Sequence, residues 1–278
     1  MTKTAPQKGR KHAVILNIKI DSSSASSLLA QISDWVERKK KFYVVTPNPE
    51  IVIAAQSDPV LASILNSADM SLPDGIGLVW ASKLSSKFTP EGSSFASVQS
   101  SKLEERISGI DVMEDLIKMA AEKQWRVFLL GGKSGVAATA AKNLTALPAQ
   151  AGQWPNSLIA FDNGPWLDNE GKSVNKEEKI KEREVLKKIN LFKPDLLFVG
   201  FGAPKQEKWV ASNYNKLQTY GIMVVGGSFD YLAGRVPRAP LWLRNLGLEW
   251  LFRLILEPWR IGRQLSLLKF IWAVVTRD

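Results

Sequence analysis

The sequence predicts an α/β protein with a Rossmann-like, mostly parallel sheet and helices on both faces. Three observations lead to this class. Short apolar runs alternate with longer segments of helical pattern, four of these runs have a continuous apolar stretch rather than an alternating one, and three of the four end in glycine. Continuous apolar strands are typical of parallel sheets that are covered on both faces. The alternation of strands with helices indicates the same class.

The four apolar runs are the candidate strands of this sheet. They cover residues 42–46, 126–131, 195–200 and 221–227. Helical segments over residues 50–68 follow the first run, and Asp58-Pro59 should divide them because proline interrupts a helix. Further helices are expected over residues 134–147 and from Pro204 onward.

Two segments depart from this alternation. Residues 84–102 are rich in serine and are expected to form a mobile loop or insertion. After Gly227 the strand–helix alternation stops, and the remaining segment has a helical pattern rich in arginine and tryptophan. The predicted organisation is a flexible basic leader (1–11), a Rossmann-like domain (12–229) and a C-terminal appendage (230–278).

The composition restricts the available chemistry. The chain has no cysteine, which excludes disulfides, thiolate catalysis and a cysteine-based zinc site. Its single histidine, His12, follows a basic leader, so Asp or Glu is expected to carry any proton transfer. The net charge of +10 favours an anionic partner, either a nucleic acid, a phosphorylated substrate or an acidic membrane face. Alternatively, the positive charge is scattered over the surface and only makes the protein more soluble.

Neither an export signal nor a membrane span is expected from the sequence. The basic start of the chain has no apolar run of the kind that a secretory signal needs. No segment reaches the roughly 20 apolar residues that span a bilayer. We therefore expect a protein of the cytosol or of the inner face of the membrane.

Glycine pairs follow three of the predicted strands. They are Gly131-Gly132, Gly200 with Gly202, and Gly226-Gly227. Glycine lets the backbone approach a ligand, and the helix that follows supplies amides for a phosphate. One such turn is often only structural, but three at one sheet edge favour a nucleotide cleft. None matches G-x-G-x-x-G or a P-loop, so a dinucleotide enzyme and an ATPase are disfavoured.

Two proline-containing turns carry polar side chains. Thr46-Pro47-Asn48-Pro49-Glu50 follows the first strand and leaves Thr46 and Asn48 free to point into the cleft, although Asn48 could instead only cap a helix. Leu72-Pro73-Asp74-Gly75 has the same form. Asp74 is the best-placed candidate base, because α/β sheets bind ligands at the carboxyl ends of their strands. A structural Asp-Gly turn is the alternative.

A third motif, Pro204-Lys205-Gln206-Glu207, opens the helix after Gly202. Lys205 and Gln206 are candidates to contact a sugar hydroxyl or a phosphate, since proline suits the first turn of a helix. Glu207 could equally be an acidic residue that compensates the helix dipole.

The motifs are similar, in identity and order, to those of the WecG/TagA/CpsF glycosyltransferase family. They cover residues 46–50, 73–75, 105–109, 200–207, 226–230, 238–242, 247–253 and 257–258. The resemblance extends over nearly the whole chain from about His12. It implies an inverting enzyme with a Rossmann-like catalytic domain and a C-terminal membrane-binding appendage. Such enzymes transfer N-acetylmannosamine or a related sugar from UDP to a polyprenyl-diphosphate-linked sugar, in the synthesis of cell-surface polysaccharides or teichoic-acid-type polymers.

The resemblance also implies roles for individual residues. Asp74 matches the proposed catalytic base, and Arg106 matches an arginine suited to the donor diphosphate. The residues that match sugar- and acceptor-positioning groups are Thr46, Asn48 and Gln206. The tail arginines thought to fold over the active site correspond to Arg253, Arg260 and Arg263. The segment before Arg106 is longer than is usual in the family because of the serine-rich insertion.

The expected mechanism needs no metal ion and no cofactor. No Asp-x-Asp occurs in the chain, so the usual carboxylate pair that binds a metal to a sugar nucleotide is missing. Arginine can take the place of the metal, because its guanidinium pairs bidentately with phosphate. We expect Asp74 to be the base and the arginines to stabilise the departing UDP.

The tail combines arginines with four tryptophans, Trp242, Trp250, Trp259 and Trp272. Basic segments with aromatic residues lie in the interface of anionic membranes, so peripheral attachment to the cytoplasmic face of the cell membrane is expected. A solvated arginine face is the alternative. A non-catalytic sugar-nucleotide-binding protein remains a second candidate. A basic nucleic-acid-binding protein is a third, but no recognised nucleic-acid-binding motif is present.

Overall fold

The structure is a computed structural model that describes residues 10–85, 101–132, 135–146 and 155–276. The chain divides into two compact units. Unit 1 comprises Met1–Ser27, Thr46–Ser108 and Arg238–Asp278, and unit 2 comprises Leu28–Val45 and Gly109–Pro237. The predicted insertion over 84–102 falls mostly outside the described residues.

Unit 2 contains five strands of a parallel sheet. They are β3 (Phe42–Val45), β5 (Val127–Gly131), β6 (Ile159–Asp162), β7 (Leu196–Gly200) and β8 (Gly221–Val224). Their order across the sheet is β3-β8-β7-β5-β6, and all four neighbouring pairs are parallel. Every residue of β3, β5, β7 and β8 is buried, as continuous apolar runs predict. These four strands were predicted, whereas β6 was not.

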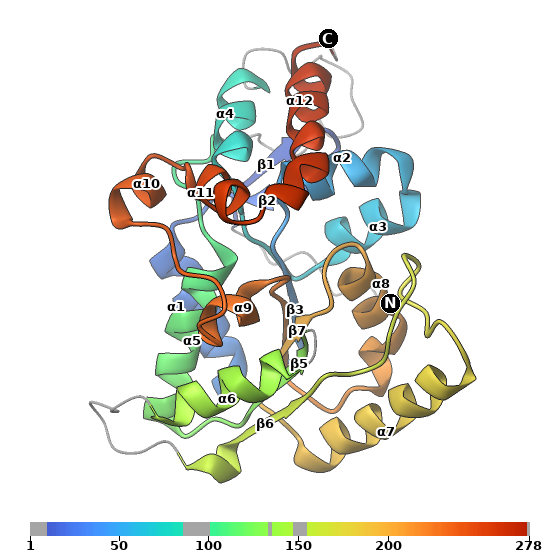
Figure 1. Cartoon of the computed structure of the whole chain (residues 1–278). Helices are drawn as coiled ribbons and strands as arrows, with labels where there is room; N and C mark the ends of the chain where they lie inside the picture. The colour runs from blue at the N-terminus through green and yellow to red at the C-terminus, as the bar shows by residue number, and fades with distance from the viewer. Residues whose placement is uncertain (1–9, 86–100, 133–134, 147–154, 277–278) are drawn as a thin grey trace. The chain divides into compact units, whose positions relative to one another are not determined.

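Helices cover this sheet on both sides. They are α1 (Ala25–Glu37, mostly in this unit), α5 (Gly109–Lys123), α6 (Val136–Ala146), α7 (Lys176–Phe192), α8 (Lys205–Asn213) and α9 (Ser228–Leu232). In Figure 1, α1 and α5 lie on one side of the strands, and α7 and α8 lie on the other. Helix α5 is amphipathic, with Met113, Leu116 and Ile117 buried at the spacing of one helical face. The predicted α/β class with a mostly parallel sheet is confirmed.

Unit 1 is mainly helical. Its elements are the β1 (His12–Ile15) and β2 (Ile18–Asp21) strands, α2 (Pro49–Ser57), α3 (Pro59–Ser67), β4 (Met70–Ser71), α4 (Ile76–Ser85), α10 (Leu241–Asn245), α11 (Glu249–Leu256), the 3-10 helix η3 (Pro258–Arg260) and α12 (Ile261–Thr276). Helix α12 packs beside α2 and α4 (Figure 1). Among the described helices, none is both long and apolar enough to cross a membrane.

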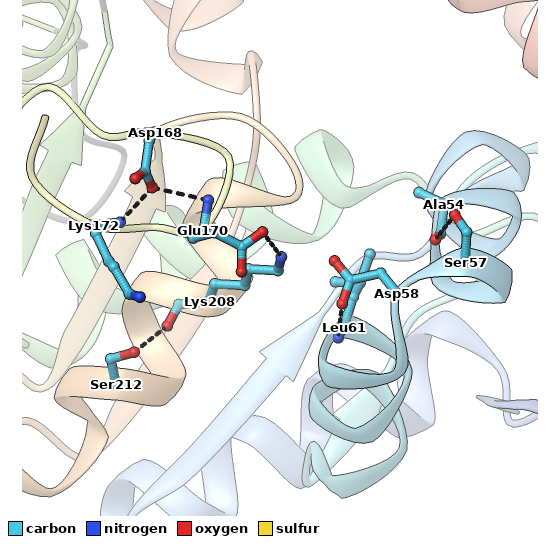
Figure 2. Close-up of polar contacts among 9 residues, drawn as sticks. All are labelled: Ala54, Ser57, Asp58, Leu61, Asp168, Glu170, Lys172, Lys208 and Ser212. Carbon is cyan, nitrogen blue, oxygen red and sulfur yellow. Dashed lines mark hydrogen bonds and ion pairs between the residues drawn. The ribbon is translucent and has the colours of Figure 1, made fainter.

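The predicted division of residues 50–68 is confirmed at Asp58. Helix α2 ends at Ser57, and Pro59 is the first residue of α3. The Asp58 carboxylate accepts a hydrogen bond from the Leu61 amide at 2.9 Å and so caps α3 (Figure 2). Proline is favoured at this first position, because the amide it lacks would have no partner within the helix.

An antiparallel hairpin, β1–β2, opens the described chain and was not predicted. Leu16 and Asn17 form its turn with φ angles of 48° and 65°. Asp21, at the end of β2, is 1% exposed. Its Oδ1 atom lies 3.2 Å from Arg10 Nη1 and 3.3 Å from His12 Nε2. Its Oδ2 atom accepts the Ser71 amide at 2.7 Å, which ties the hairpin to β4.

Candidate active site

Within unit 1, backbone hydrogen bonds bring together three segments that carry candidate residues. The Asp74 amide donates to the Pro47 carbonyl at 3.0 Å, and the Ile107 amide donates to the Pro73 carbonyl at 2.9 Å. The predicted base is therefore attached on one side to the segment that holds Thr46 and Asn48, and its neighbour Pro73 is attached to the residue after Arg106.

Gly75 allows this close approach of the segments. Its φ angle is +119°, and a Cβ atom there would lie 3.2 Å from Cδ of Pro49. A side chain would be strained both by the dihedral angle and by the contact. The Asp-Gly pair thus makes a tight turn against α2, and Asp74 at this turn is half-buried.

Thr46 and Asn48 occupy different environments. Thr46 is buried, at 7% exposure. Asn48 is half-buried, and its Oδ1 atom accepts the Ile51 amide at 2.9 Å, which makes it the N-cap of α2. The capping role that the sequence left open is present. A contact of either side chain with a sugar stays a prediction.

Arg106 is held by an acidic residue that the sequence analysis missed. Its Nη1 atom lies 3.1 Å from Oε2 of Glu249, the first residue of α11. The other oxygen of Glu249, Oε1, lies 3.1 Å from Nε of Arg238. The motif 247–253 contains this glutamate, but the pairing joins residues 143 positions apart, so no local pattern could reveal it.

The tail arginines lie on successive elements. Arg253 is on α11, Arg260 on η3 and Arg263 on α12. Arg253 Nε pairs with Glu257 Oε2 at 2.6 Å, one helical turn away. These elements and α10 expose large apolar side chains, which include Trp242, Trp250, Leu256, Trp259, Ile261, Leu265, Leu268 and Trp272.

In unit 2, the glycine turns gather at the carboxyl ends of adjacent strands, as predicted. The Gly132 amide donates to the Gly200 carbonyl at 3.0 Å. A Cβ atom on Gly131 would lie 2.8 Å from the Gly200 carbonyl, and one on Gly200 would lie 2.9 Å from the Gly226 oxygen. Gly131, Gly132 and Gly226 all have positive φ angles, of 108°, 81° and 53°. Only glycine fits this packing without strain.

The side chain of Gln206 joins two of these turns. Its Oε1 atom accepts the amides of Gly202 and Gly226, both at 3.1 Å. Its Nε2 atom donates to Oε1 of Glu207 at 3.0 Å. Gln206 is only 2% exposed, whereas the neighbouring Lys205 is half-buried. Gln206 therefore fixes the turns that follow β7 and β8, and a direct contact with a sugar stays a prediction.

Glu207 is buried beside Gln206. It is 1% exposed, and no hydrogen bond to its Oε2 atom occurs within the part of the chain that the structure describes. Burial raises the pKa of Glu207 to about 7, against the hydrogen bond from Gln206, which lowers it. Burial also raises the pKa of Tyr43 well above its usual value, and the charge of Glu207 adds to this rise.

The first half of α8 is also attached to the segment that follows β6, through Lys208. Asp168 Oδ1 accepts the amides of Glu170 and Lys172 at 2.9 Å each, and Glu170 pairs with Lys208 at 2.8 Å (Figure 2). The Lys208 side chain is 5% exposed. These contacts fix α8, which carries Gln206 and Glu207.

No group of three or more His, Asp or Glu side chains that could hold a metal ion occurs in residues 10–85, 101–132, 135–146 and 155–276. Metal-independent transfer remains a prediction.

A Rossmann-like sheet with glycine turns at one edge is the architecture of enzymes that bind phosphorylated or nucleotide-linked substrates. Comparison with known proteins defines the class further. The chain belongs to the glycosyl transferase WecG/TagA/CpsF family, whose sequence profile matches residues 13–278. The resemblance deduced from the motifs is confirmed, and the protein is a glycosyltransferase.

Two relatives are named for the reaction that they catalyse. Over 266 residues, the chain is 32% identical to the N-acetylglucosaminyldiphosphoundecaprenol N-acetyl-beta-D-mannosaminyltransferase of Bacillus subtilis (strain 168), with 95% of this chain and 91% of the relative covered. It is 30% identical over 262 residues to the protein of the same name from Staphylococcus aureus (strain NCTC 8325 / PS 47), with 94% and 91% covered.

Proposed function

We propose that this glycosyltransferase moves an N-acetylmannosamine-type sugar from UDP to a polyprenyl-diphosphate-linked N-acetylglucosamine, with inversion at the transferred carbon. The names of the two relatives support the acceptor and the sugar. The observation that carries the proposal is the arrangement in unit 1, where the Asp74 turn is hydrogen-bonded to the Thr46–Asn48 segment and to the residue after Arg106.

In the proposed reaction, Asp74 takes the proton of the acceptor hydroxyl as its oxygen attacks the anomeric carbon. A positioned carboxylate can act as such a base, provided that it is ionised when the acceptor binds. The bond from the anomeric carbon to UDP breaks from the opposite face, and arginine stabilises the charge that develops on the diphosphate. Arg106 is the first candidate for this role, because its segment is bonded to the Asp74 turn.

The product would serve the synthesis of a cell-surface polysaccharide or of a teichoic-acid-type polymer, since the acceptor is lipid-linked. Attachment to the cytoplasmic face of the membrane would bring the enzyme to that acceptor. The exposed Trp259 and Trp272, at 76% and 70%, support a membrane-facing tail. Arg253, Arg260 and Arg263 would contact lipid phosphates or the substrate diphosphate.

A donor screen tests the proposal. The purified protein is mixed with several UDP-sugars and a short-chain prenyl-diphosphate N-acetylglucosamine, and the products are identified by mass and by the anomeric coupling in NMR. We expect one added N-acetylhexosamine from UDP-N-acetylmannosamine, with inverted configuration. Transfer from none of the donors, or a product of retained configuration, would contradict the proposal.

The membrane part is tested by flotation with liposomes. Binding to anionic vesicles that weakens as salt rises is expected, because each basic residue near such a surface contributes about 1 kcal/mol. Equal recovery with neutral and anionic vesicles would contradict it.

A further inference from the structure

Glu249 bridges two arginines in the interior of unit 1. Its side chain is 11% exposed, and those of Arg106 and Arg238 are 15% and 19% exposed. Each carboxylate oxygen pairs with a different guanidinium at 3.1 Å. The three side chains come from two segments of unit 1 that are far apart in sequence, Thr46–Ser108 for Arg106 and Arg238–Asp278 for Arg238 and Glu249.

The bridge is attached to the turn that carries Asp74. On one side, the residue after Arg106 donates its amide to the Pro73 carbonyl. On the other side, Gly247 packs so tightly that a Cβ atom there would lie 2.7 Å from Cβ of Ile76. Gly247 has a φ of +73°, which places it at the turn just before Glu249. The bridge is therefore attached at Pro73 and at Ile76, which lie on either side of Asp74 in the sequence.

The bridge carries one net positive charge, because two guanidinium groups share one carboxylate. Burying such ions costs desolvation, and apolar residues of similar size often give equal stability. Stability alone therefore does not account for the bridge. A guanidinium has five donors in a planar fork, so an arginine that pairs with a carboxylate can contact a phosphate at the same time.

We propose that Arg238 is a second diphosphate-binding arginine, beside Arg106, and that Glu249 is the positioning residue that holds the two guanidinium groups together. The inference rests on the proposed function and extends it to two residues that the sequence motifs had given no role. A diphosphate occurs in both substrates, as UDP in the donor and as the lipid diphosphate in the acceptor. The two arginines would bind a diphosphate from either substrate, and the experiment below distinguishes the donor from the acceptor.

Unit 1 offers a matched control for the bridge. Asp21 is also a buried carboxylate between two basic side chains, Arg10 and His12, but it ties the hairpin to β4. Replacing Asp21 by Asn breaks a bridge of the same kind in the same unit. Any kinetic change in this variant reports loss of stability alone.

Two substitutions test the bridge itself. Arg238→Lys keeps the charge but removes the planar fork. Glu249→Asp keeps the charge but removes one methylene, so the shorter carboxylate cannot reach both arginines at 3.1 Å without a shift. If Glu249→Asp does not fold, Glu249→Gln replaces it. Thermal melts of each variant confirm that it is folded at the assay temperature.

The readouts are the affinities for UDP and for UMP, measured by calorimetry, and the KM for the short-chain prenyl-diphosphate acceptor. We expect both variants to weaken the binding of one diphosphate ligand about tenfold, which corresponds to the loss of one charge-assisted hydrogen bond. A lower affinity for UDP with little change in the affinity for UMP assigns the two arginines to the diphosphate of the donor. A higher acceptor KM with unchanged UDP affinity assigns it to the acceptor.

Two results would overturn the inference. Arg238→Lys with wild-type constants for both ligands would remove Arg238 from diphosphate binding. Glu249→Asp or Glu249→Gln with no more effect than Asp21→Asn would reduce Glu249 to a structural ion pair. The calorimetric arm needs no turnover. Failure of sugar transfer in the wild type would therefore count against the proposed function and leave the test of the arginine pair intact.

Discussion

The two units hold their buried carboxylates in opposite ways. In unit 1, Glu249 lies between two arginines, and the Asp74 turn is attached nearby. In unit 2, Glu207 is more deeply buried, its Oε1 atom accepts a hydrogen bond from the neutral amide of Gln206, and its pKa is raised to about 7. Unit 1 thus gathers charged side chains, whereas at the sheet edge of unit 2 a buried glutamine holds two glycine turns together by accepting their amides. On the proposed function, we predict that unit 1 supplies the proton transfer and that the glycine turns of unit 2 contact the nucleotide.

The largest effect is expected at the candidate base. Asp74→Asn should lower kcat by about 10²- to 10⁴-fold, the usual contribution of a general base. The amide keeps the size of the side chain but cannot accept the proton. Initial rates of UDP release at saturating donor and acceptor measure the change. Turnover close to the wild-type rate would remove Asp74 from the role of base.

A smaller effect is expected at the glutamine of unit 2. Gln206→Leu removes the acceptor for the Gly202 and Gly226 amides, and each amide left without a partner costs about 1–3 kcal/mol where water cannot reach it. The donor KM should rise about tenfold or more, as the two turns lose their common tether. Urea melts and donor kinetics measure the two consequences.

Gln56→Leu is the matched control for this variant. Gln56 lies in unit 1, and its amide nitrogen donates to the Leu16 and Val52 carbonyls. This control should lose stability without a change in the donor KM. Equal rises in KM for both variants would show that the effect is not specific to the glycine turns.

Glu207→Gln tests the raised pKa. The folded protein favours the protonated carboxyl, so its stability is fully present below the unfolded pKa of 4.5 and is lost as the pH rises through about 7. Glutamine cannot ionise and still accepts the hydrogen bond from Gln206. The variant should match the wild type near pH 5 and gain on the order of 2–3 kcal/mol relative to it at pH 8. Urea melts at the two pH values decide this, and a pH-independent difference would contradict it.

No effect at all is expected from chelation. Arginines are the proposed stabilisers of the departing diphosphate, so EDTA should leave the transfer rate unchanged. Activity that is lost on chelation and restored by magnesium or manganese would contradict the arginine mechanism.

Local patterns predicted much of this architecture. The four continuous apolar runs are all buried parallel strands, and Asp58-Pro59 separates α2 from α3 as expected. The β1–β2 hairpin, β4 and β6 were missed because none of them is a continuous buried apolar run: β1, β2 and β6 include polar or partly exposed residues, and β4 has only two residues.

The site was predicted in part. The gathering of glycine turns follows from strand order, because carboxyl ends of adjacent parallel strands share one edge. The inward orientation of Gln206 and the pairing of Arg106 with Glu249 could not be predicted. Both depend on contacts between distant segments, which are 20 residues apart for Gln206 with Gly226 and 143 apart for Arg106 with Glu249.

UDP binding to two variants side by side tests the division of roles between the units most directly. Calorimetry of Asp74→Asn should give the wild-type affinity for UDP, because the base acts on the acceptor. Calorimetry of Gln206→Leu should give an affinity about tenfold weaker, since the glycine turns that Gln206 holds together lose their preorganised geometry. The reverse pattern, with UDP binding lost in Asp74→Asn and intact in Gln206→Leu, would contradict the account.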